Sequence, residues 1–370
     1  MKYQLKDIIS EYTEKNTNGE YEPVAVGKYG IRKRSDIYKK ELAKDYSKNK
    51  VIRKNTMIVG MGSTQIDIGV LSSDDIYSVS PAYHTFSINS SIIRSEYLDY
   101  LFQAKNSLYT SRYMIASARQ GKTVNLKDML FETVDIPDFD VQQKTVEKIN
   151  EIKDCISLEE KQLALYDELI KSRFIEMFGE KFEGEKIKLS KISNPIIGLT
   201  YRPDNVCDDG TIVLRSGNIQ NNELQIVDDV IRVTGVKIND NKYIQDKDIL
   251  MCSRNGSARL VGKSCLIRNP QEKMTFGAFM TVIRTNYPYF LQSFFTSQYF
   301  KEQLTGVATT SVNQITSTML NNYEVIEPSI EEEIEFASFV ELIDKSKFIV
   351  QKRIDTYKEL LAKKMDEYFN

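Results

Sequence analysis

The sequence predicts an α/β protein of the α+β type, in which two pseudo-symmetric mixed α/β domains are joined by two long helices paired as an antiparallel coiled coil. Three observations predict this fold. A stretch that begins at Pro137 recurs without a gap at Pro328, an offset of 191 residues. Both copies have the spacing of a long helix. The blocks that precede the copies contain similar strands and polar turns in the same order, so the repeat unit is a domain plus a helix.

The first repeated stretch contains neither proline nor glycine between Val141 and Phe178. Its apolar residues recur in steps of three, four and seven, as in a heptad pattern, and each helix would be roughly 60 Å long. Glu159 and Arg173 interrupt the seam of the first helix. The residues predicted to pack the helices together are Ile149, Ile152, Leu163, Tyr166 and Ile170 in the first copy, and Val340, Ile343, Ile354, Tyr357 and Leu361 in the second.

Helix limits follow from proline and glycine. Pro137 and Pro328 end the preceding strands, and Asp or Ser after them can cap the helices. Gly179 is expected to form the C-cap of the first helix. These limits predict a domain at 1–137, a long helix at 138–180, a second domain at 181–328 and a second long helix at 329–370. A simpler alternative, in which each helix packs only on its own domain, stays open.

Each domain block contains short β-rich runs separated by Gly, Asn, Asp and Ser, and one late helix. The segment "IRKNTMIVGMGST" parallels "IQDKDILMCSRNGS", and "SPAYHTFSI" parallels "TFGAFMTVI". The predicted strands are Thr56–Val59, Thr85–Ile88, Ile212–Arg215, Val227–Val233, Lys263–Ile267 and Phe279–Arg284, and the predicted helices are Ser95–Tyr109 and Pro288–Leu304.

Composition argues against several classes of protein. The chain has 370 residues, a net charge of -2, one histidine and four cysteines that form no C-x-x-C pair, so the usual zinc-ligand spacing is missing and we expect no metal site. The sequence has neither a G-x-S-x-G nor a phosphate-binding glycine motif, and we expect no catalytic residues. It also has no apolar run of 18 residues, so we expect a soluble chain without membrane contact, with its thiols in a reducing cytoplasm.

A basic stretch suggests nucleic-acid binding. Between Lys28 and Lys54 there are 11 Lys and Arg residues against 3 acidic residues, a local charge of +8, with tyrosines interleaved. Such a stretch could neutralise several phosphates, although a solvated basic loop would look the same. Its predicted DNA contacts are Lys28, Tyr29, Arg32, Lys33 and Arg34.

Polar turns at matching places in the two blocks give further candidates. Glycine in such turns permits close backbone approach, and Arg suits the edge of guanine whereas Asn or Gln suits adenine. Ordinary surface loops have a similar composition, and the pairing of side chains with bases stays open. The predicted contacts are Ser63, Thr64, Gln65, Arg119, Gln120, Lys122 and Thr123 in the first block, and Arg215, Asn218, Arg254, Asn255, Ser257, Arg259, Thr309, Thr310, Ser311 and Gln314 in the second.

Taken together, these features resemble the specificity subunits of type I restriction–modification systems over essentially the whole chain. The resemblance is carried by the two-fold layout, by "LIKSRFIEMFGE" at Leu169–Glu180, by "VLRSGNI" at Val213–Ile219, and by "GKTVNLKDMLFETVDIP" and "SVNQITSTMLNNYEVIEP" before the helices. The basic stretch is a departure, because the second block is acidic at Ile219–Val230.

The resemblance implies that each domain is a target recognition domain that reads one half of a bipartite, asymmetric site on double-stranded DNA, with the helices setting the spacer. It implies two methyltransferase subunits docked on the helices, two restriction and translocase subunits, and a bacterial or archaeal cytoplasm. AdoMet, ATP and magnesium would belong to those partners, and this chain would hold no cofactor. Two other functions stay open: a nuclease with duplicated domains, and a helical adaptor that binds only proteins.

Overall fold

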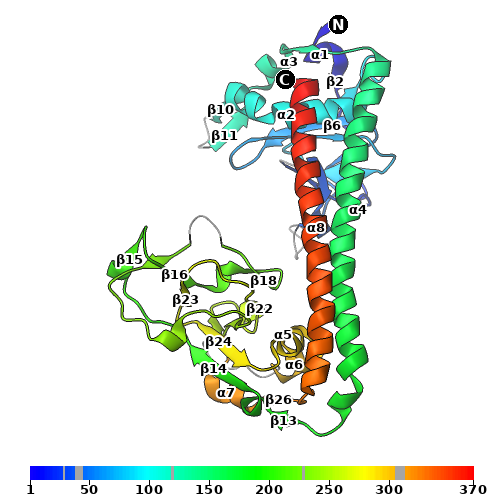
Figure 1. The fold of residues 1–370 in the computed structure, drawn as a ribbon. Coiled ribbons are helices and arrows are strands. Elements are labelled where there is room, and N and C mark those ends of the chain that lie inside the picture. The colour runs from blue at the N-terminus through cyan, green and yellow to red at the C-terminus, as the bar shows by residue number, and fades with distance from the viewer. Residues whose placement is uncertain (28–29, 38–44, 118–120, 227–229, 305–312) are drawn as a thin grey trace. The chain divides into compact units, whose positions relative to one another are not determined.

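The computed structural model describes residues 1–27, 30–37, 45–117, 121–226, 230–304 and 313–370. The chain divides into two compact units (Figure 1): Met1–Glu160 with Lys352–Asn370, and Lys161–Gln351. Both divisions fall inside a long helix, and Lys161 and Lys352 are equivalent positions of the 191-residue repeat. Each unit therefore combines one mixed α/β domain with a segment of both long helices.

The two long helices confirm the mixed architecture with long helices that the repeat predicted. They are α4 (Phe139–Phe178) and α8 (Ile330–Phe369), each of 40 residues. The Asp138 carboxylate accepts a hydrogen bond from the Val141 amide at 2.9 Å. Ser329 and Glu332 form a reciprocal cap, because each backbone amide donates to the other's side chain. Each helix start is therefore capped by the residue that follows the proline.

Gly179 follows the last residue of α4 but does not form a left-handed cap, because the chain continues in right-handed conformation with φ of −54°. A Cβ at this position would lie 2.5 Å from the Ile175 carbonyl oxygen. Gly179 therefore directly follows the helix, as predicted, but without the left-handed conformation of a glycine C-cap. The residue is glycine because the chain turns tightly against the preceding helical turn.

In each unit the segments of α4 and α8 run antiparallel. In the first unit Glu159 pairs with Arg353 at 2.8 Å, and Glu160 with Lys358 at 3.1 Å. In the second unit the pairs are Asp167 with Lys347 at 2.9 Å, and Arg173 with Glu335. The two residues that interrupt the apolar seam, Glu159 and Arg173, thus each form an ion pair with the opposite helix.

Burial along the helices is uneven. Half of the residues predicted to pack the helices together are buried and half are partly exposed, and both tyrosines are partly exposed. Ile149, Ile152, Val340, Ile343 and Ile354 are buried, whereas Leu163, Tyr166, Ile170, Tyr357 and Leu361 are partly exposed. Tyr166 belongs to the second unit and Tyr357 to the first. The assignment of all ten residues to a helix seam stays a prediction.

The domain of the first unit is built on an antiparallel sheet with the strand order β2-β9-β6-β7. Its strands and helices are β1 (Lys2–Gln4), α1 (Leu5–Ile8), β2 (Ile9–Glu11), β3 (Val24–Gly27), β4 (Gly30–Lys33), β5 (Lys50–Ile52), β6 (Thr56–Met61), β7 (Ile66–Leu71), β8 (Tyr77–Val79), β9 (His84–Ile88), α2 (Ser95–Tyr113), β10 (Met114–Ser117), β11 (Gly121–Val124), α3 (Leu126–Leu130) and β12 (Thr133–Asp135). The central strand β6 is almost completely buried, so its end is the natural place to present side chains from a rigid support.

The domain of the second unit repeats this sheet with the order β14-β24-β20-β22 and adds a second four-stranded sheet, β15-β19-β16-β23. Its elements are β13 (Ile187–Lys188), β14 (Ser193–Ile197), β15 (Val206–Cys207), β16 (Thr211–Leu214), β17 (Ile219–Gln220), β18 (Glu223–Leu224), β19 (Arg232–Val233), β20 (Ile249–Cys252), β21 (Arg254–Asn255), β22 (Ser264–Leu266), β23 (Met274–Phe276), β24 (Met280–Thr285), α5 (Pro288–Thr296), α6 (Gln298–Gln303), β25 (Asn313–Gln314), α7 (Ser317–Asn322) and β26 (Glu324–Val325). The predicted helix Pro288–Leu304 is interrupted at Ser297.

The turn before the central strand shows how closely the two domains correspond. Asn55 and Lys247 both have positive φ, of 62° and 65°. The next residue in each case, Thr56 or Asp248, accepts a hydrogen bond from the backbone amide three residues earlier, at 3.2 Å and 2.8 Å. The internal duplication therefore extends to the hydrogen bonds of a single turn, although the two turns share few residues.

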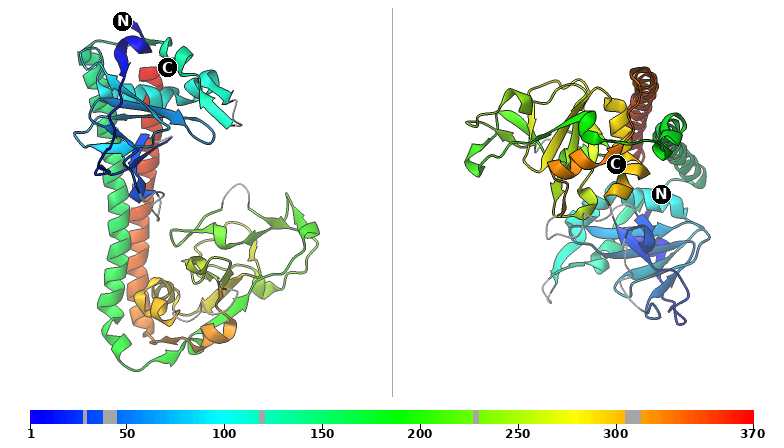
Figure 2. Two further views of the ribbon diagram at one scale, coloured as in Figure 1. Left: turned by 180° about the vertical axis from the view of Figure 1, so that it is seen from behind. Right: turned by 90° about the horizontal axis from the view of Figure 1, so that it is seen from below.

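A cluster of aromatic rings fastens the second domain to its helix segments. Phe178 of α4 is fully buried, 4.9 Å from the ring of Phe290 in α5 and 5.6 Å from that of Phe336 in α8. The two views of Figure 2 show α5 and α6 beside this end of α8. In the first unit the repeat-equivalent Phe369 packs on Tyr97 of α2, with ring centroids 5.1 Å apart. Each domain therefore attaches to the helices through its late helix.

A buried polar side chain completes each attachment. Glu333 of α8 accepts hydrogen bonds from the backbone amides of Tyr289 and Phe290 at 2.8 Å and 3.0 Å, at the start of α5. Its repeat equivalent is Gln142, which accepts from the Arg94 amide at 2.8 Å, just before α2. The same position therefore carries an ionisable group in the second unit and a neutral amide in the first.

We expect the stability of the second unit to fall as pH rises. Burial raises the pKa of Glu333 from 4.5 to about 7, while the two amides and Lys247 oppose the shift. Between these values the unfolded chain releases a proton that the folded chain retains, so stability falls through this interval and is constant above about pH 7. A shift of this size corresponds to about 3 kcal/mol.

Glu333→Gln tests this expectation because it gives the second unit the residue of the first. Hydrogen exchange in α5 at pH 5 and pH 8 should differ in the parent chain more than in the variant. Glu331→Gln, at an exposed position on the same helical turn, is the control. The same pH dependence in parent and Glu333→Gln would contradict the expectation.

Candidate nucleic-acid interface

A pocket of about 450 Å³ lies beyond the end of the central strand β20 in the second unit. Its lining includes Arg215, Ser216, Arg254, Asn255 and Phe279. Arg254 is exposed, with its guanidinium 5.2 Å from the centre of the Phe279 ring, and that ring is itself 57% exposed. A guanidinium held against an aromatic face is pre-oriented for a planar acceptor such as the edge of guanine.

Short strand pairings gather the polar residues of this pocket. Arg254 and Asn255 of β21 pair with Gln314 and Asn313 of β25. The Asn255 amide donates to the Ser216 hydroxyl at 3.2 Å, which links β21 to the turn that contains Arg215. Asn255 also accepts from the Ser257 backbone amide at 2.9 Å. The structure thus brings together predicted residues that are up to 99 positions apart in the sequence.

A pocket of about 420 Å³ lies at the corresponding place in the first unit, at the end of β6. It is lined by Arg34, Tyr83 and Asp67, by the β3 residues 24–26, and by the turn residues that include Gly62 and Ser63. In Gly60 a Cβ would lie 2.2 Å from the Tyr83 ring, so glycine is required for that ring to lie on the strand. The group that approaches the backbone closely at Gly60 is therefore the Tyr83 ring of the protein itself.

The two pockets are equivalent by strand register. Gly62 and Ser63 follow β6 as Arg254 and Asn255 follow β20. The two rings are offset by one residue, because Val59 pairs with His84 and Met251 with Thr281, so that Tyr83 corresponds to Met280 and Phe279 lies one residue earlier. Each pocket combines an arginine with an aromatic ring and polar groups from a turn. Similar chemistry is therefore presented at the same point of two similar sheets.

The other predicted residues lie in different settings. Lys122, Thr123, Arg32, Lys33, Ser63, Thr64, Arg215 and Arg259 are exposed, and Gln65, Ser257 and Gln314 are partly exposed. Asn218 is only 6% exposed, and its amide bonds the backbone of Arg215 and Gln225. Lys28, Tyr29, Arg119, Gln120, Thr309, Thr310 and Ser311 lie outside the described residues. The DNA contacts proposed for all of these residues stay predictions.

The charge of the basic stretch is partly compensated by acidic residues from outside it. Lys33 pairs with Glu22 at 3.2 Å, and Lys54 with Asp74 at 3.0 Å. Arg53 binds both oxygens of Glu14, at 2.7 Å and 3.2 Å. The local excess of +8 is therefore larger than the charge that these residues present to a phosphate backbone.

Sequence reasoning did not identify Tyr83, Phe279 or Asp67 as site residues. Asp67 did leave a signal, because it is the one charged residue in the six-residue strand Ile66–Leu71. Phe279 and Tyr83 stood in the parallel segments, but an aromatic residue beside a strand usually belongs to the core. Only the strand register places these rings against the turns.

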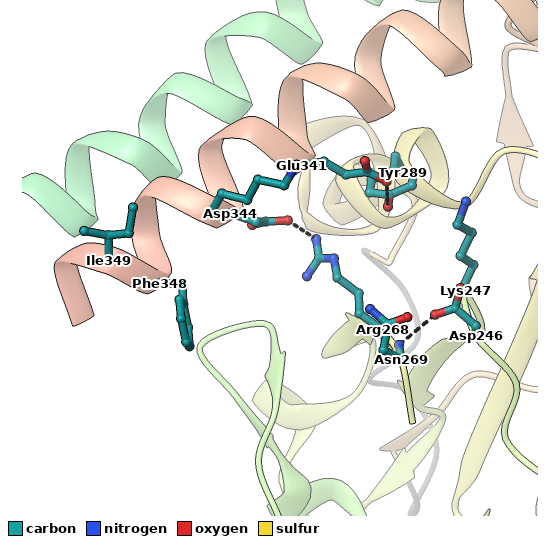
Figure 3. A pocket seen from close by; sticks show the side chains of 10 residues that line it. Asp246, Lys247, Arg268, Asn269, Tyr289, Glu341, Asp344, Phe348 and Ile349 are labelled. Atoms are coloured by element: carbon teal, nitrogen blue, oxygen red, sulfur yellow. Dashed lines mark hydrogen bonds and ion pairs between the residues drawn. The ribbon is translucent and has the colours of Figure 1, made fainter. Parts of the chain in front are cut away.

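A further pocket, of about 750 Å³, lies between the second domain and α8 (Figure 3). Several of its polar groups bind one another: Arg268 pairs with Asp344 at 2.6 Å, and the Tyr289 hydroxyl donates to Glu341 at 2.6 Å. The Asn269 amide donates to Asp246 at 2.7 Å. The contacts of Arg268 and Tyr289 join the domain to its helix segment, and we therefore assign the pocket a structural role.

Three further features bear on which kinds of site the chain can form. Among the described residues, no three His, Cys, Asp or Glu side chains form a group suited to a metal ion. Within the same part of the chain, no helix is both long and apolar enough to span a membrane. Burial raises the pKa of the Cys265 thiol to about 12, which keeps this cysteine protonated and unreactive.

The first part of the chain resembles a known protein family in sequence. Residues 1–165 match the family model for the type I restriction modification DNA specificity domain. The chain is 26% identical over 153 residues to the type I restriction enzyme StySPI specificity subunit of Salmonella potsdam, a match that covers 39% of this chain and 33% of that protein.

Two solved structures share the fold. One is the S subunit of a type I restriction–modification system from M. genitalium, with a TM-score of 0.54, 13% identity, and coverage of 99% of this chain and 95% of that one. The other is from a study of complex assembly and conformational transition of the type I R-M system, with a TM-score of 0.53, 14% identity, and coverage of 100% and 97%. Residues 1–165 therefore match the model of the type I restriction modification DNA specificity domain, and the whole chain shares the fold of the two solved structures.

Proposed function

We propose that this chain is the DNA sequence-specificity subunit of a type I restriction–modification complex. Each domain reads one half of a bipartite, asymmetric target on double-stranded DNA. The observation that carries the proposal is the pair of equivalent pockets, each with an arginine, an aromatic ring and polar turn groups at the end of a rigid central strand. Because the residues in the two pockets differ, the two half-sites differ too.

The proposal assigns catalysis to other subunits. Two methyltransferase subunits dock on the long helices, which also set the spacer, and two restriction and translocase subunits join them. AdoMet, ATP and magnesium belong to those partners, and the complex acts on DNA in the cytoplasm. None of the matches named above is to a nuclease with duplicated domains or to a protein-only adaptor, and the two pockets favour neither.

Methylome sequencing tests the proposal. A host that carries this chain and its cognate methyltransferase is compared with a host in which an early stop codon interrupts this chain. We expect a bipartite adenine-methylated motif that disappears with the stop codon. An unchanged methylome, with the methyltransferase shown to be active, would refute the specificity role.

Arg254→Ala should relax specificity at one position of one half-site. The guanidinium stacked on Phe279 is placed for the acceptors of guanine, so its loss should cost 5- to 150-fold in discrimination, which corresponds to about 1–3 kcal/mol. Binding selection from a random DNA library, with parent and variant complexes, measures this. Lys237→Ala, an exposed position outside the pocket lining, is the control. A uniform loss of affinity across all sequences would instead assign Arg254 to a phosphate contact.

A further inference from the structure

The pocket of the first unit contains a buried carboxylate. Asp67 lies in β7, is 9% exposed and lines the pocket together with Arg34 and Tyr83. Its two oxygens lie 2.7 Å and 2.8 Å from the place that a Cβ on Gly62 would occupy. The side chain therefore points at the turn that follows β6, and glycine at position 62 makes room for it.

The carboxylate is poorly compensated within the described part of the chain. No backbone N–H of the described residues donates to it within hydrogen-bond distance, and burial raises its pKa above the usual value. The Gln65 side chain favours the ionised form, but its amide nitrogen is itself buried without a hydrogen-bond partner among those residues. The Gln65 side chain therefore stabilises the Asp67 carboxylate less than a full hydrogen bond would. A buried acceptor and a buried donor lie side by side, each with unused capacity.

Such a pair matches particular edges of DNA bases. In the major groove, adenine presents its N6 amine beside the N7 acceptor, and a cytosine N4 amine lies beside the O6 acceptor of its paired guanine. A carboxylate accepts from the amine, while an amide donates to the adjacent acceptor. A carboxylate is poorly suited to phosphate because both are anionic, which argues against a role in backbone contact.

The second unit has the opposite charge at the same position. Asp67 pairs with Gly60 across the β6–β7 ladder. In the equivalent ladder, the residue opposite Cys252 is Lys263, whose carbonyl accepts from the Cys252 amide at 2.8 Å. A carboxylate in one unit is thus replaced by an ammonium group in the other. If this side chain only stabilised the sheet, we would expect the same kind of residue in both units. The two units instead have opposite charges at this position.

We propose that Asp67 is a specificity-determining residue of the first domain, where it accepts a hydrogen bond from the exocyclic amine of a base, adenine N6 or cytosine N4, with Gln65 donating to the neighbouring acceptor. This inference rests on the proposed function, because it assumes that the first pocket reads DNA. It goes further by naming the chemical group that the pocket selects.

Base analogues test the inference on the unmodified protein. The full chain with its methyltransferase is titrated with target duplexes in which each adenine is replaced in turn by purine, and each cytosine by 2-pyrimidinone, both of which lack the amine. The relevant half-site is the one that Arg254→Ala leaves unchanged. We expect one replacement to weaken binding by about 5- to 150-fold, and its identity distinguishes adenine from cytosine.

The Asp67→Asn complex is then titrated with the same duplexes. The amide has nearly the same shape, so the pocket is retained while the anionic acceptor is lost. The decisive replacement should now cost less than threefold, because the contact is already broken, and library selection should show altered preference at that one position. Asp74→Asn, at an exposed surface ion pair of the same unit, should behave as the parent chain.

Three other results have distinct meanings. If the parent tolerates the loss of every amine in that half-site, the inference is wrong. If Asp67→Asn keeps the full penalty at the decisive position, another residue reads the amine and the inference is also wrong. If the parent complex shows no sequence preference for any duplex, the proposed function itself fails, and the two failures are thereby distinguished.

Discussion

Phe178→Ala should lower the stability of the second unit by about 3–5 kcal/mol, the usual cost of removing a buried ring. Phe178 is fully buried at the end of α4 and contacts rings from both α5 and α8. Its loss opens a cavity between the domain and both helix segments. Since the pocket with Arg254 belongs to the same unit, half-site binding should weaken at temperatures where α5 begins to detach.

Hydrogen exchange resolved by peptide is the suitable measurement, because a chain with two compact units need not unfold in one step. Protection should fall in α5 and in the α8 segment of the second unit. Ile175→Ala, one turn earlier and 58% exposed, is the matched control and should cost less than about 1 kcal/mol. Equal effects of the two variants would show that the aromatic cluster does not fasten the domain.

Arg284→Ala should be similarly severe, at about 3–5 kcal/mol, because it leaves a buried carboxylate without its partner. Arg284 binds both oxygens of Asp248, at 2.9 Å and 3.1 Å, and the Asp248 side chain is only 3% exposed. Asp248 also fixes the turn before β20 by accepting from the Gln245 amide. Disturbing this turn should displace the strand whose far end carries Arg254.

The double variant separates the ion pair from simple loss of packing. Asp248→Asn combined with Arg284→Ala removes the unpaired charge and should recover part of the lost stability. Arg232→Ala, which breaks a more exposed pair with Glu272, is the control and should cost about 1 kcal/mol or less. Chemical denaturation monitored by exchange in β20 gives the comparison. A double variant no more stable than Arg284→Ala would contradict the assignment to a buried charge.

The long helices and the duplication were predictable because their signals are local and repeated. Proline, a capping residue and an apolar period fixed the starts of α4 and α8 to within a residue or two. The strand predicted at Thr56–Val59 appeared as Thr56–Met61, since three of its first four residues are β-branched and favour a strand. These elements are specified by neighbours in the sequence.

The candidate site was less predictable because its geometry is non-local. Strand β7 was missed, as Gly69 and Asp67 lower its strand propensity, and its burial comes from tertiary packing. The helix at Pro288–Leu304 was predicted unbroken, but Ser297 bonds the preceding turn through its hydroxyl and its amide and divides it. The link from Asn255 to Ser216 spans 39 residues and follows only from the sheet pairing.

The division of the chain has a consequence for its synthesis. The second unit is one continuous segment, 161–351, whereas the first needs residues 352–370 to complete its core, where Phe369 packs on Tyr97. A ribosome moving along the message therefore releases everything that the second unit requires while the first still lacks one side of its core. The domain of the first unit is therefore synthesised first but completed last. Until residues 352–370 are made, its uncovered apolar surface is available for chaperones to bind.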